Sequence, residues 1–415
     1  MSNGNRDLIV GLDIGTSKIV ALVAEFTAEG HLNIIGVGDQ ASRGLNKGVV
    51  VNVEETVATI NRVIEEVELM AGCQVREVYT GIAGSHIKSF DSKGMVAVKG
   101  KEVSTTDVER VMETARAMPI PDGQKILHNL CQEFVIDGQD GYREPIGITG
   151  TRLEVNVHIV TGAVSAAQNI MKCVRRAGLE VCDIVLQPLA SSHAVLSEEE
   201  KDIGVCLLDI GGGTTDIAVW RRGAIRYTAV IPVAGSQVTR DIADYFRTSV
   251  KSAEDVKHRY GYALAALADP EASLEIPGAD EDVDEDKSTA RQLSRQALAE
   301  VIEARLEELY GLVQQELAQS GYEHRLSAGI VLTGGSAQMP GMIELGQEIF
   351  HMPVRLGVPK YKGSLADIVR TPRYATAYGL LLEAQQQRLR GQKVKETRSI
   401  KDIFSRMSSW FEKNF

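Results

Sequence analysis

Residues 204–220 read GVCLLDIGGGTTDIAVW, an apolar run, a glycine-rich turn and a second apolar run. This order is typical of two β-strands joined by a tight turn. Residues 8–26, LIVGLDIGTSKIVALVAEF, follow the same order, and LDIG occurs at 12–15 and again at 208–211. An internal repeat across about half the chain predicts two similar halves, each opening with a strand, an Asp-Ile-Gly turn and a returning strand.

The composition limits the class of protein. A chain of 415 residues exceeds one ordinary core, so we expect two or more domains, and 44% hydrophobic residues is typical of globular proteins. The net charge of −11 argues against a basic nucleic-acid-binding surface, so no nucleic-acid partner is expected. Five scattered cysteines without a CxxC pair predict reduced thiols in a cytoplasmic compartment.

A third glycine-rich turn, TGGSAQMPG at 333–341, also leaves a predicted strand. Glycine lets backbone amides approach phosphate oxygens, and an aspartate at the end of a strand can hold a hydrated magnesium ion. One such turn alone is better explained as a plain hairpin, but three in order predict a nucleotide held between two halves. No GxxxxGK[ST] motif occurs and no GxGxxG follows a strand, which excludes P-loop and Rossmann sites.

The order and wording of the three turns resemble the actin-like ATPase superfamily. Residues 187–196 (QPLASSHAVL) and 374–382 (YATAYGLLL) resemble its two connecting helices. Within the superfamily the chain is most similar to the FtsA family of bacterial cell-division proteins, from about residue 7 to residue 415. The segments that carry this closer resemblance are SRGLNKGVVVN at 42–52, the stretch 85–160, RQALAEVIEAR at 295–305 and an amphipathic tail.

The resemblance implies an α/β fold of two actin-like lobes, with duplicated mixed-sheet domains and helices, two inserted subdomains and a C-terminal amphipathic helix. The expected divisions are 1–84 and 159–196 for the first lobe, 85–158 for its insert, 197–225 and 305–385 for the second lobe, 226–304 for the second insert, 386–398 for a linker, and 399–415 for the helix.

The resemblance also implies ATP and magnesium in a cleft between the lobes. Asp13 and Asp209 would hold the magnesium ion through water, and Gln187 would orient the attacking water, which makes these three the candidate catalytic residues. The expected contacts to phosphates and adenosine are Gly15, Thr16, Ser17, Lys18, Gly211, Gly212, Gly213, Thr214, Thr215, Gly334, Gly335, Ser336 and Met339. Glu254 and Lys257 match a helix that approaches the ribose and purine, or they form an exposed helical pair. Because the family resembles a polymerising scaffold, we expect at most a weak ATPase.

The tail SIKDIFSRMSSWFEKNF, residues 399–415, has a helical apolar stripe. On a helix its large apolar side chains fall within an arc of about 140°. They are Ile400, Ile403, Phe404, Met407, Trp410, Phe411 and Phe415. Eight basic and three acidic residues follow from Arg388 onward. The pattern predicts a helix that lies reversibly on an anionic membrane surface, with docking on the body or on a partner protein as the alternative.

The resemblance further implies a peripheral protein on the cytoplasmic face of the inner membrane, at the division septum. It would polymerise with itself, tether filaments of the tubulin-like protein FtsZ in the Z ring, and recruit later division proteins. Arg295 and Arg305 are candidates for binding the acidic FtsZ C-terminal peptide, or they are merely solvated. The alternatives are a pilus-assembly actin relative, which leaves the tail without a function, and a metabolite kinase, for which the sequence offers no convincing catalytic base.

Overall fold

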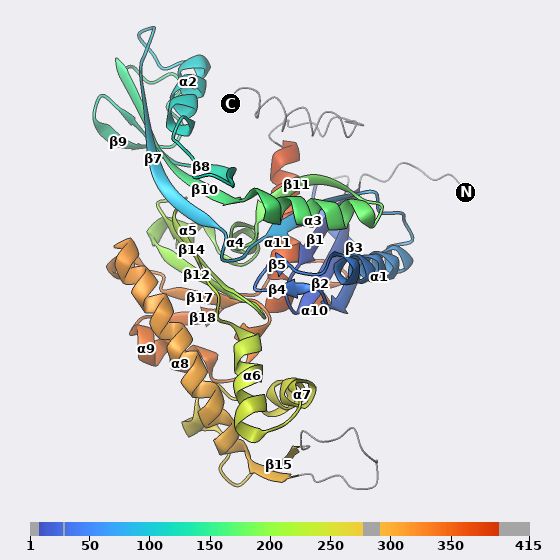
Figure 1. Cartoon of the computed structure of the whole chain (residues 1–415). Helices are drawn as coiled ribbons and strands as arrows, with labels where there is room; N and C mark the ends of the chain where they lie inside the picture. Colours follow the sequence, from blue (N-terminus) through green and yellow to red (C-terminus); the bar gives the residue numbers. More distant parts are fainter. Residues whose placement is uncertain (1–7, 28–29, 277–290, 390–415) are drawn as a thin grey trace.

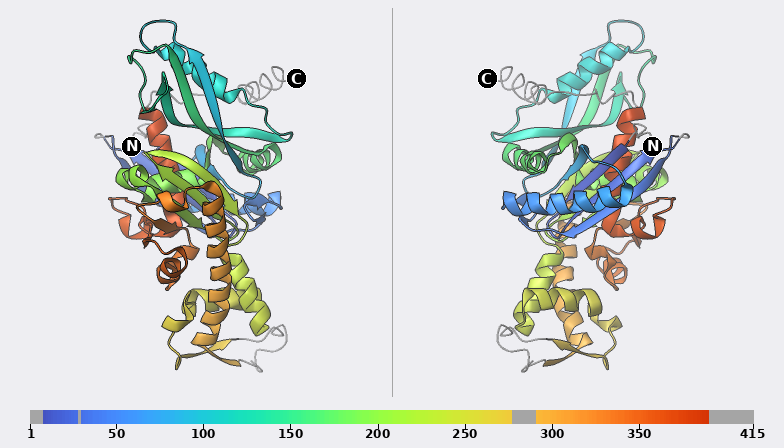
Figure 2. Two further views of the ribbon diagram at one scale, coloured as in Figure 1. Left: turned by 90° about the vertical axis from the view of Figure 1, so that its left-hand side faces the viewer. Right: turned by 90° about the vertical axis from the view of Figure 1, so that its right-hand side faces the viewer.

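The computed structural model describes residues 8–27, 30–276 and 291–389. Two lobes with similar sheets occupy the middle of the molecule (Figure 1). Residues 85–160 stand at one end and residues 240–276 at the opposite end (Figure 2). This arrangement confirms the predicted α/β fold with two inserted segments.

The first lobe is built on a mixed five-stranded sheet in the order β11-β6-β1-β2-β3. Its strands are β1 (Leu8–Ile14), β2 (Lys18–Phe26), β3 (Leu32–Ala41), β6 (Glu77–Ile82) and β11 (Glu180–Leu186). β1 and β2 form the antiparallel hairpin predicted at 8–26, whereas β6 runs parallel to β1. Alternate side chains of β1 face opposite sides of the sheet. Val10 and Leu12 pack against the helices α1 (Val53–Ala71) and α3 (Val164–Arg176).

The second lobe repeats this arrangement in a five-stranded sheet. Its strands are β12 (Val205–Ile210), β13 (Thr215–Arg221), β14 (Ala224–Ile231), β17 (Ile330–Thr333) and β18 (Val354–Leu356). Read from the antiparallel edge, the orders are β3-β2-β1-β6-β11 and β14-β13-β12-β17-β18. The predicted repeat is therefore confirmed. The helices α6 (Gly235–Phe246), α8 (Arg295–Ser320) and α9 (Met342–Phe350) contribute side chains to the core on one face of this sheet.

One hydrophobic core joins the two lobes. The helices α4 (Gln187–Val195) and α11 (Ala375–Leu389) lie in it, together with Leu22 of the first sheet and Leu207 of the second. The helices cross so closely that a Cβ on Gly379 would lie 1.9 Å from the Ala190 carbonyl oxygen. These are the two connecting helices predicted from the sequence, and they hold the lobes together through close packing.

The end of α11 differs from the sequence-based expectation. The predicted second lobe ended at residue 385, but α11 continues to Leu389, so the first residues of the predicted linker 386–398 are helical. Contacts with the first lobe hold this last turn. Gln387 Nε2 donates to Asp183 Oδ2 at 2.8 Å, and Arg388 Nη2 donates to the Leu8 carbonyl at 3.2 Å.

The insert at 85–158 forms a four-stranded antiparallel sheet in the order β7-β10-β8-β9, with one helix packed on it. The elements are β7 (Lys88–Ala97), α2 (Thr105–Arg116), β8 (Gln124–Ile136), β9 (Gln139–Tyr142) and β10 (Arg152–Ala163). A capping box starts α2, since Ser104 accepts from the Asp107 amide and the Asp107 carboxylate accepts from the Ser104 amide. β10 continues directly into α3 and so ties the insert to the first lobe.

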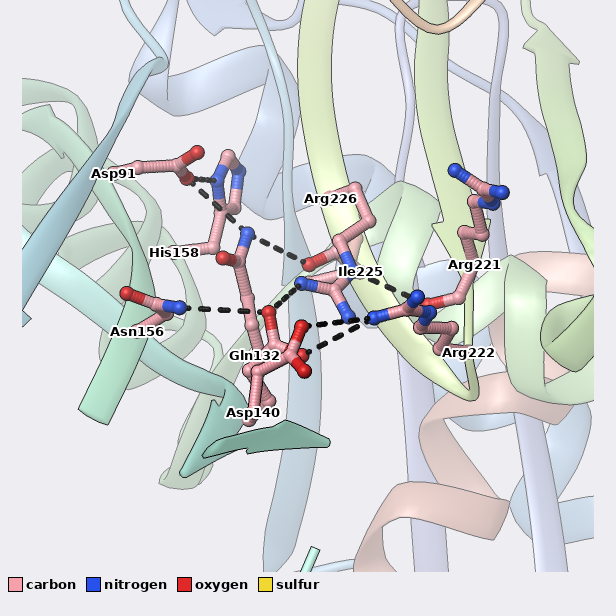
Figure 3. A network of polar contacts seen from close by, with 10 residues as sticks. Asp91, Gln132, Asp140, Asn156, His158, Arg221, Arg222, Ile225 and Arg226 are labelled. Atoms are coloured by element: carbon pink, nitrogen blue, oxygen red, sulfur yellow. Dashed lines mark hydrogen bonds and ion pairs between the residues drawn. The ribbon is translucent and has the colours of Figure 1, made fainter. Parts of the chain in front are cut away.

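The same insert also contacts β14, the edge strand of the second lobe, through polar groups (Figure 3). Gln132 Nε2 donates to the Ile225 carbonyl at 3.2 Å, and Arg226 pairs with Glu133 at 3.1 Å. His158 lies buried with its ring nitrogens 2.8 Å from Asp91 Oδ1 and 3.0 Å from Thr228 Oγ1. The insert is thus fastened to both lobes.

The second insert begins later than the sequence suggests. Residues 226–231, assigned to it from their polar texture, form most of β14, because they pair with β13 along the edge of the sheet. α6, α7 (Val250–Tyr260), β15 (Ser273–Ile276), β16 (Arg291–Ser294) and the start of α8 make up this end of the molecule. The remaining elements are β4 (Leu45–Asn46), β5 (Val49–Val50), α5 (Glu198–Ile203), α10 (Ala366–Val369) and 3-10 turns at Ala265–Leu267, Glu323–Arg325, Ser336–Gln338 and Pro372–Tyr374.

Candidate functional site

A cavity of about 990 Å³ lies between the lobes, where β1 and β12 end. It brings together residues from both halves of the sequence. The predicted residues that line it are Asp13, Gly15, Thr16, Ser17, Lys18, Gln187, Asp209, Gly211, Gly212, Thr214, Glu254, Lys257, Gly334, Gly335, Ser336 and Met339. Gly213 and Thr215 do not line it. Thr215 Oγ1 donates instead to the Val233 carbonyl at 2.8 Å, within the second lobe.

The turns after β1 and β12 have the same backbone geometry. The Gly15 amide donates to the Lys18 carbonyl at 2.9 Å, and the Gly211 amide donates to the Thr214 carbonyl at 3.0 Å. Lys18 of the first turn therefore occupies the place that Thr214 has in the second. The duplicated hairpins thus place one lysine and one threonine at corresponding edges of the cavity.

The two turns meet face to face. A Cβ on Gly213 would lie 2.6 Å from the Thr16 hydroxyl oxygen, and one on Gly212 would overlap the Ser17 side chain. Glycine is therefore required in the second turn because the first turn carries side chains there. The two turns are therefore complementary, because the second turn lacks side chains where those of the first turn lie.

Asp13 is the carboxylate at the end of β1, and it is 5% exposed. Burial raises the pKa of Asp13 to about 6, while the Lys18 ammonium acts in the opposite direction. Gln187 Nε2, at the start of α4, donates to Asp13 Oδ1 at 3.0 Å. The predicted catalytic pair Asp13 and Gln187 is thus brought into contact.

Asp209, at the end of β12, is also buried, and burial raises its pKa while hydrogen bonds and Lys18 oppose the shift. Ser191 Oγ donates to Asp209 Oδ2 at 2.5 Å, and Thr376 Oγ1 donates to the same oxygen at 3.3 Å. Sequence reasoning did not single out these two hydroxyls. They lie in the segments recognised as connecting helices, but neither segment predicts which side chain faces the cavity.

Asp216 is a third buried carboxylate in the cavity, and the sequence-based prediction missed it. It lies directly across the hairpin from Asp209 in the β12–β13 register. Burial, with Asp209 as the next cause, raises the pKa of Asp216 well above its usual range. Asp216 Oδ1 has no hydrogen-bond partner among the described residues. The hairpin register, readable from the four-residue turn, was the signal that could have identified it.

The Lys18 side chain is held by a second group that the sequence did not reveal. Its ammonium donates to the Arg373 carbonyl, and burial lowers the pKa of Lys18. The Arg373 guanidinium is itself bound by Asp39, with two contacts of 2.6 Å. Tyr374 Oη donates to Asp39 at 3.1 Å. A cluster from β3 and the 3-10 turn Pro372–Tyr374, which precedes α11, therefore sets the position of the lysine.

The third glycine-rich turn closes the second-lobe side of the cavity. Gly334 has φ +87°, and a Cβ there would lie 2.5 Å from Asp209 Oδ1. Ser336 Oγ donates to the Gly211 carbonyl at 2.7 Å, which fastens the third turn to the second. The predicted adenosine turn and phosphate turn are thus one connected structure.

Glu254 and Lys257 both line the cavity from α7. Lys257 Nζ contacts the Gly235 carbonyl at 3.1 Å, Thr239 Oγ1 at 2.8 Å and Glu254 Oε2 at 2.7 Å. Burial tends to raise the pKa of Glu254, but hydrogen bonds from His258 and the Lys257 charge hold it at about 2. The buried ammonium of Lys257 therefore braces the N-terminus of α6, and the interpretation as an exposed pair does not hold for Lys257.

The two predicted partner residues, Arg295 and Arg305, do not line the cavity. Arg305 on α8 pairs with both carboxylate oxygens of Asp241, at 2.5 and 2.9 Å. Arg295 Nε donates to the Tyr260 carbonyl at 3.1 Å. The seven membrane residues predicted between Ile400 and Phe415 lie outside the described residues.

The donors and acceptors of the cavity fit a nucleotide phosphate chain and a hydrated cation. The glycine turns expose backbone amides without side-chain obstruction, and Lys18 supplies a positive charge. Asp13, Asp209 and Asp216 are buried carboxylates for which a cation would favour the ionised form. Within the described ranges, no group of three or more acidic, histidine or cysteine side chains is arranged to hold a metal directly.

Comparison with solved structures defines the fold class. A structure titled "PilM-PilN type IV pilus biogenesis complex" aligns with a TM-score of 0.63 at 18% identity, covering 91% of this chain and 98% of that one. MreB5 of Spiroplasma citri, bound to ADP, aligns with a TM-score of 0.53 at 16% identity over 92% and 98% of the chains. The chain has the actin-like ATPase fold.

Sequence comparison defines the family. Family models described as "Cell division protein FtsA" and "SHS2 domain inserted in FTSA" match residues 206–379 and 84–161. A cell division protein FtsA from Pseudomonas aeruginosa is 53% identical over 98% of each chain. One from Escherichia coli K12 is 43% identical over 99% of each chain. The chain belongs to the FtsA family of cell division proteins.

Among the helices of the described ranges, none has the length and apolar character needed to cross a bilayer.

Proposed function

We propose that the chain binds ATP together with magnesium in the cavity between its lobes. The observation that supports this most is the meeting of two equivalent turns, in which the glycines of the second turn leave room for Thr16 and Ser17 of the first, next to Lys18. A protein of the same fold, MreB5 of Spiroplasma citri, is bound to ADP in its solved structure. The phosphates would contact the amides of both turns and Lys18, and the adenosine would lie by Gly334, Gly335 and Met339.

Asp13 and Asp209 would hold the hydrated magnesium ion through water, with Asp216 beside them. A bound magnesium ion supplies positive charge that offsets the charge of the phosphates. The residues of the chain orient its water shell and exclude bulk water. This fits three buried carboxylates that Lys18 alone does not neutralise.

ATP affinity of the folded full chain, measured by calorimetry with and without magnesium, tests this function. We expect micromolar or tighter binding with magnesium and at least tenfold weaker binding of the Asp209→Asn variant. No binding at 1 mM ATP, about a thousandfold above a micromolar Kd, would overturn the proposal.

Hydrolysis is proposed to be slow at most. Gln187 would orient an attacking water, but its amide is engaged with Asp13. A water-orienting role requires that this amide be shared or released. A phosphate-release assay that finds fast, magnesium-dependent turnover by the isolated monomer would contradict this.

We propose that the nucleotide-binding body acts as a polymerising scaffold of the division septum. It would tether FtsZ filaments to the cytoplasmic face of the inner membrane and recruit later division proteins. Membership of the FtsA family and the amphipathic tail at 399–415 support this. Binding by one tail is weak, and alignment of many tails along a filament would make it long-lived.

Vesicle sedimentation tests the membrane step. Replacing Trp410 and Phe411 by glutamate is expected to abolish pelleting with anionic vesicles in the presence of ATP, because both side chains belong to the apolar stripe. ATP binding should remain, since neither residue belongs to the three glycine-rich turns predicted to bind the nucleotide. Undiminished pelleting of this variant would remove the tail as the anchor.

The FtsZ peptide is proposed to bind at the second insert, near Arg295 and Arg305. Because Arg305 is paired with Asp241, reversal of its charge also breaks an internal contact. Peptide affinity of the double variant Arg295→Glu, Arg305→Glu should therefore be compared with that of Asp241→Asn, which removes the charge of one of the two acidic partners of Arg305 and leaves Glu308. Unchanged affinity in the double variant would exclude both arginines from the site.

A further inference from the structure

The helix α4 presents two polar side chains to two of the three buried carboxylates of the cavity. Gln187 and Ser191 are four residues apart, and residues at this spacing lie on one face of a helix. Gln187 contacts Asp13 of the first lobe, whereas Ser191 contacts Asp209 of the second lobe. One helix therefore contacts one buried carboxylate of each half.

The hydroxyls around Asp209 converge on one of its two oxygens. Ser191 and Thr376 both donate to Oδ2, and their own oxygens lie 3.0 Å apart. No described hydrogen bond ends on Asp209 Oδ1, and the neighbouring Gly334 has no side chain to cover it. Two fixed donors on one oxygen determine the rotamer of the carboxylate. They leave the other oxygen available to the cavity.

The adjacent residue on α4 serves as an internal comparison. Ser191 and Ser192 are both fully buried. The Ser192 hydroxyl donates to the Pro188 carbonyl at 2.7 Å and accepts from the Trp220 indole at 2.8 Å. Its partners belong to the packed interior, and none of them is an acidic group of the cavity. Two neighbouring serines of equal burial thus have different surroundings.

We propose that Ser191, supported by Thr376, is a positioning residue for magnesium. It holds Asp209 so that Oδ1 faces the hydrated ion that accompanies the nucleotide. The proposal rests on the ATP and magnesium binding proposed above. Since Ser191 belongs to α4 and Asp209 to β12, the same hydrogen bond also joins the two lobes at the carboxylate.

The test uses the full chain and measures ATP affinity over a range of magnesium concentrations. The variants are Ser191→Ala, Ser191→Thr, Thr376→Val and, as the matched control, Ser192→Ala. Loss of a partner that orients a metal-binding group usually costs 10–100-fold in metal affinity. We expect Ser191→Ala to raise the magnesium concentration for half-maximal binding about tenfold. Thr376→Val should raise it less, Ser191→Thr should remain near wild type, and Ser192→Ala should leave it unchanged.

ATP binding in EDTA separates positioning from general damage. Ser191→Ala should leave this metal-free affinity unchanged, because the hydroxyl acts through Asp209. Equal magnesium dependence of Ser191→Ala and Ser192→Ala would overturn the proposal. If Ser191→Ala does not fold, an unshifted magnesium dependence in Thr376→Val would overturn it. A wild-type chain whose ATP binding ignores magnesium would instead reject the proposed metal site, and the positioning role with it.

Discussion

The two central hairpins, β1–β2 and β12–β13, have the same backbone geometry but carry different side chains at corresponding positions. Across the strands, Asp13 faces Val20, whereas Asp209 faces Asp216. The first turn carries Thr16, Ser17 and Lys18, whereas the second carries glycines at the positions that meet the first two. The repeat thus gives the two lobes similar hairpins, and the sequence differences between the two turns allow them to pack against each other.

The first test asks whether the halves share one core. Gly379→Ala on α11 should lower the free energy of unfolding by about 3 kcal/mol, since its Cβ would meet the Ala190 backbone. Gly311→Ala on α8 is the matched control, because its Cβ meets open space and helical alanine gains about 1 kcal/mol over glycine. Urea denaturation measures both. Equal free energies of unfolding for the two variants would show that α4 and α11 can move apart without loss of stability.

The second test uses the pH dependence of stability to compare the pKa of Asp13 in the folded chain with its pKa in the unfolded chain. The folded pKa, about 6, lies above the ordinary 3.8, so the folded chain binds the proton more tightly. This contribution is complete below pH 3.8 and is lost as the pH rises through 6.

Stability in metal-free buffer at pH 7 should therefore increase by about 3 kcal/mol in Asp13→Asn, and the gain should shrink toward pH 4. Denaturation curves between pH 4 and 7 measure this difference. A gain that does not depend on pH would mean that Asp13 is not the titrating group.

The third test compares corresponding positions of the two turns. Lys18→Ala should weaken ATP binding about 30-fold, because it removes a charged contact worth about 2 kcal/mol. Thr214→Ala should weaken it less than threefold, since the Thr214 hydroxyl donates to Asp216 at 3.2 Å. Calorimetric titration distinguishes the two. Equal losses would mean that the turns contribute alike and that the lysine adds no special contact.

The fourth test copies the first hairpin into the second. Asp216→Val places there the residue type that faces Asp13. It should stabilise the metal-free chain by about 1 kcal/mol, because a buried and partly unsatisfied carboxylate is removed. Thermal denaturation without nucleotide measures the effect. A loss of stability would show that the Asp216 carboxylate makes a stabilising interaction besides its hydrogen bond with Thr214.

The sequence predicts those features of the fold that local patterns encode. The two hairpins and the three glycine turns follow from apolar runs, glycines and an internal repeat, whereas the two connecting helices were identified by their resemblance to the actin-like ATPase superfamily. The contact between Asp39 and Arg373 could not be predicted, because 334 residues separate them. The strand at 226–231 was assigned to an insert because three of its six residues are polar, although its pairing with β13 places it in the sheet.

The candidate site likewise contains residues that local sequence patterns predict and residues that they do not. Asp13 and Asp209 are visible because each ends an apolar strand before a glycine turn. Ser191 and Thr376 sit among small residues of two helices, and only the crossing of those helices brings them to one carboxylate oxygen. The polar strand surface around Gln132 and Glu133 likewise gave no sign that it covers a strand of the other lobe.

The insert's double attachment has a mechanical consequence. Gln132 and Glu133 of the insert contact β14, and the segment that follows β14 contacts the second glycine turn through Val233 and Gly235. Because the insert is joined to the first lobe by the chain and to the second lobe by polar contacts, any rotation of the lobes relative to each other must either move the insert or break these contacts. A pair of distance labels, one on the insert and one on α9, would therefore register the opening of the cavity from outside it.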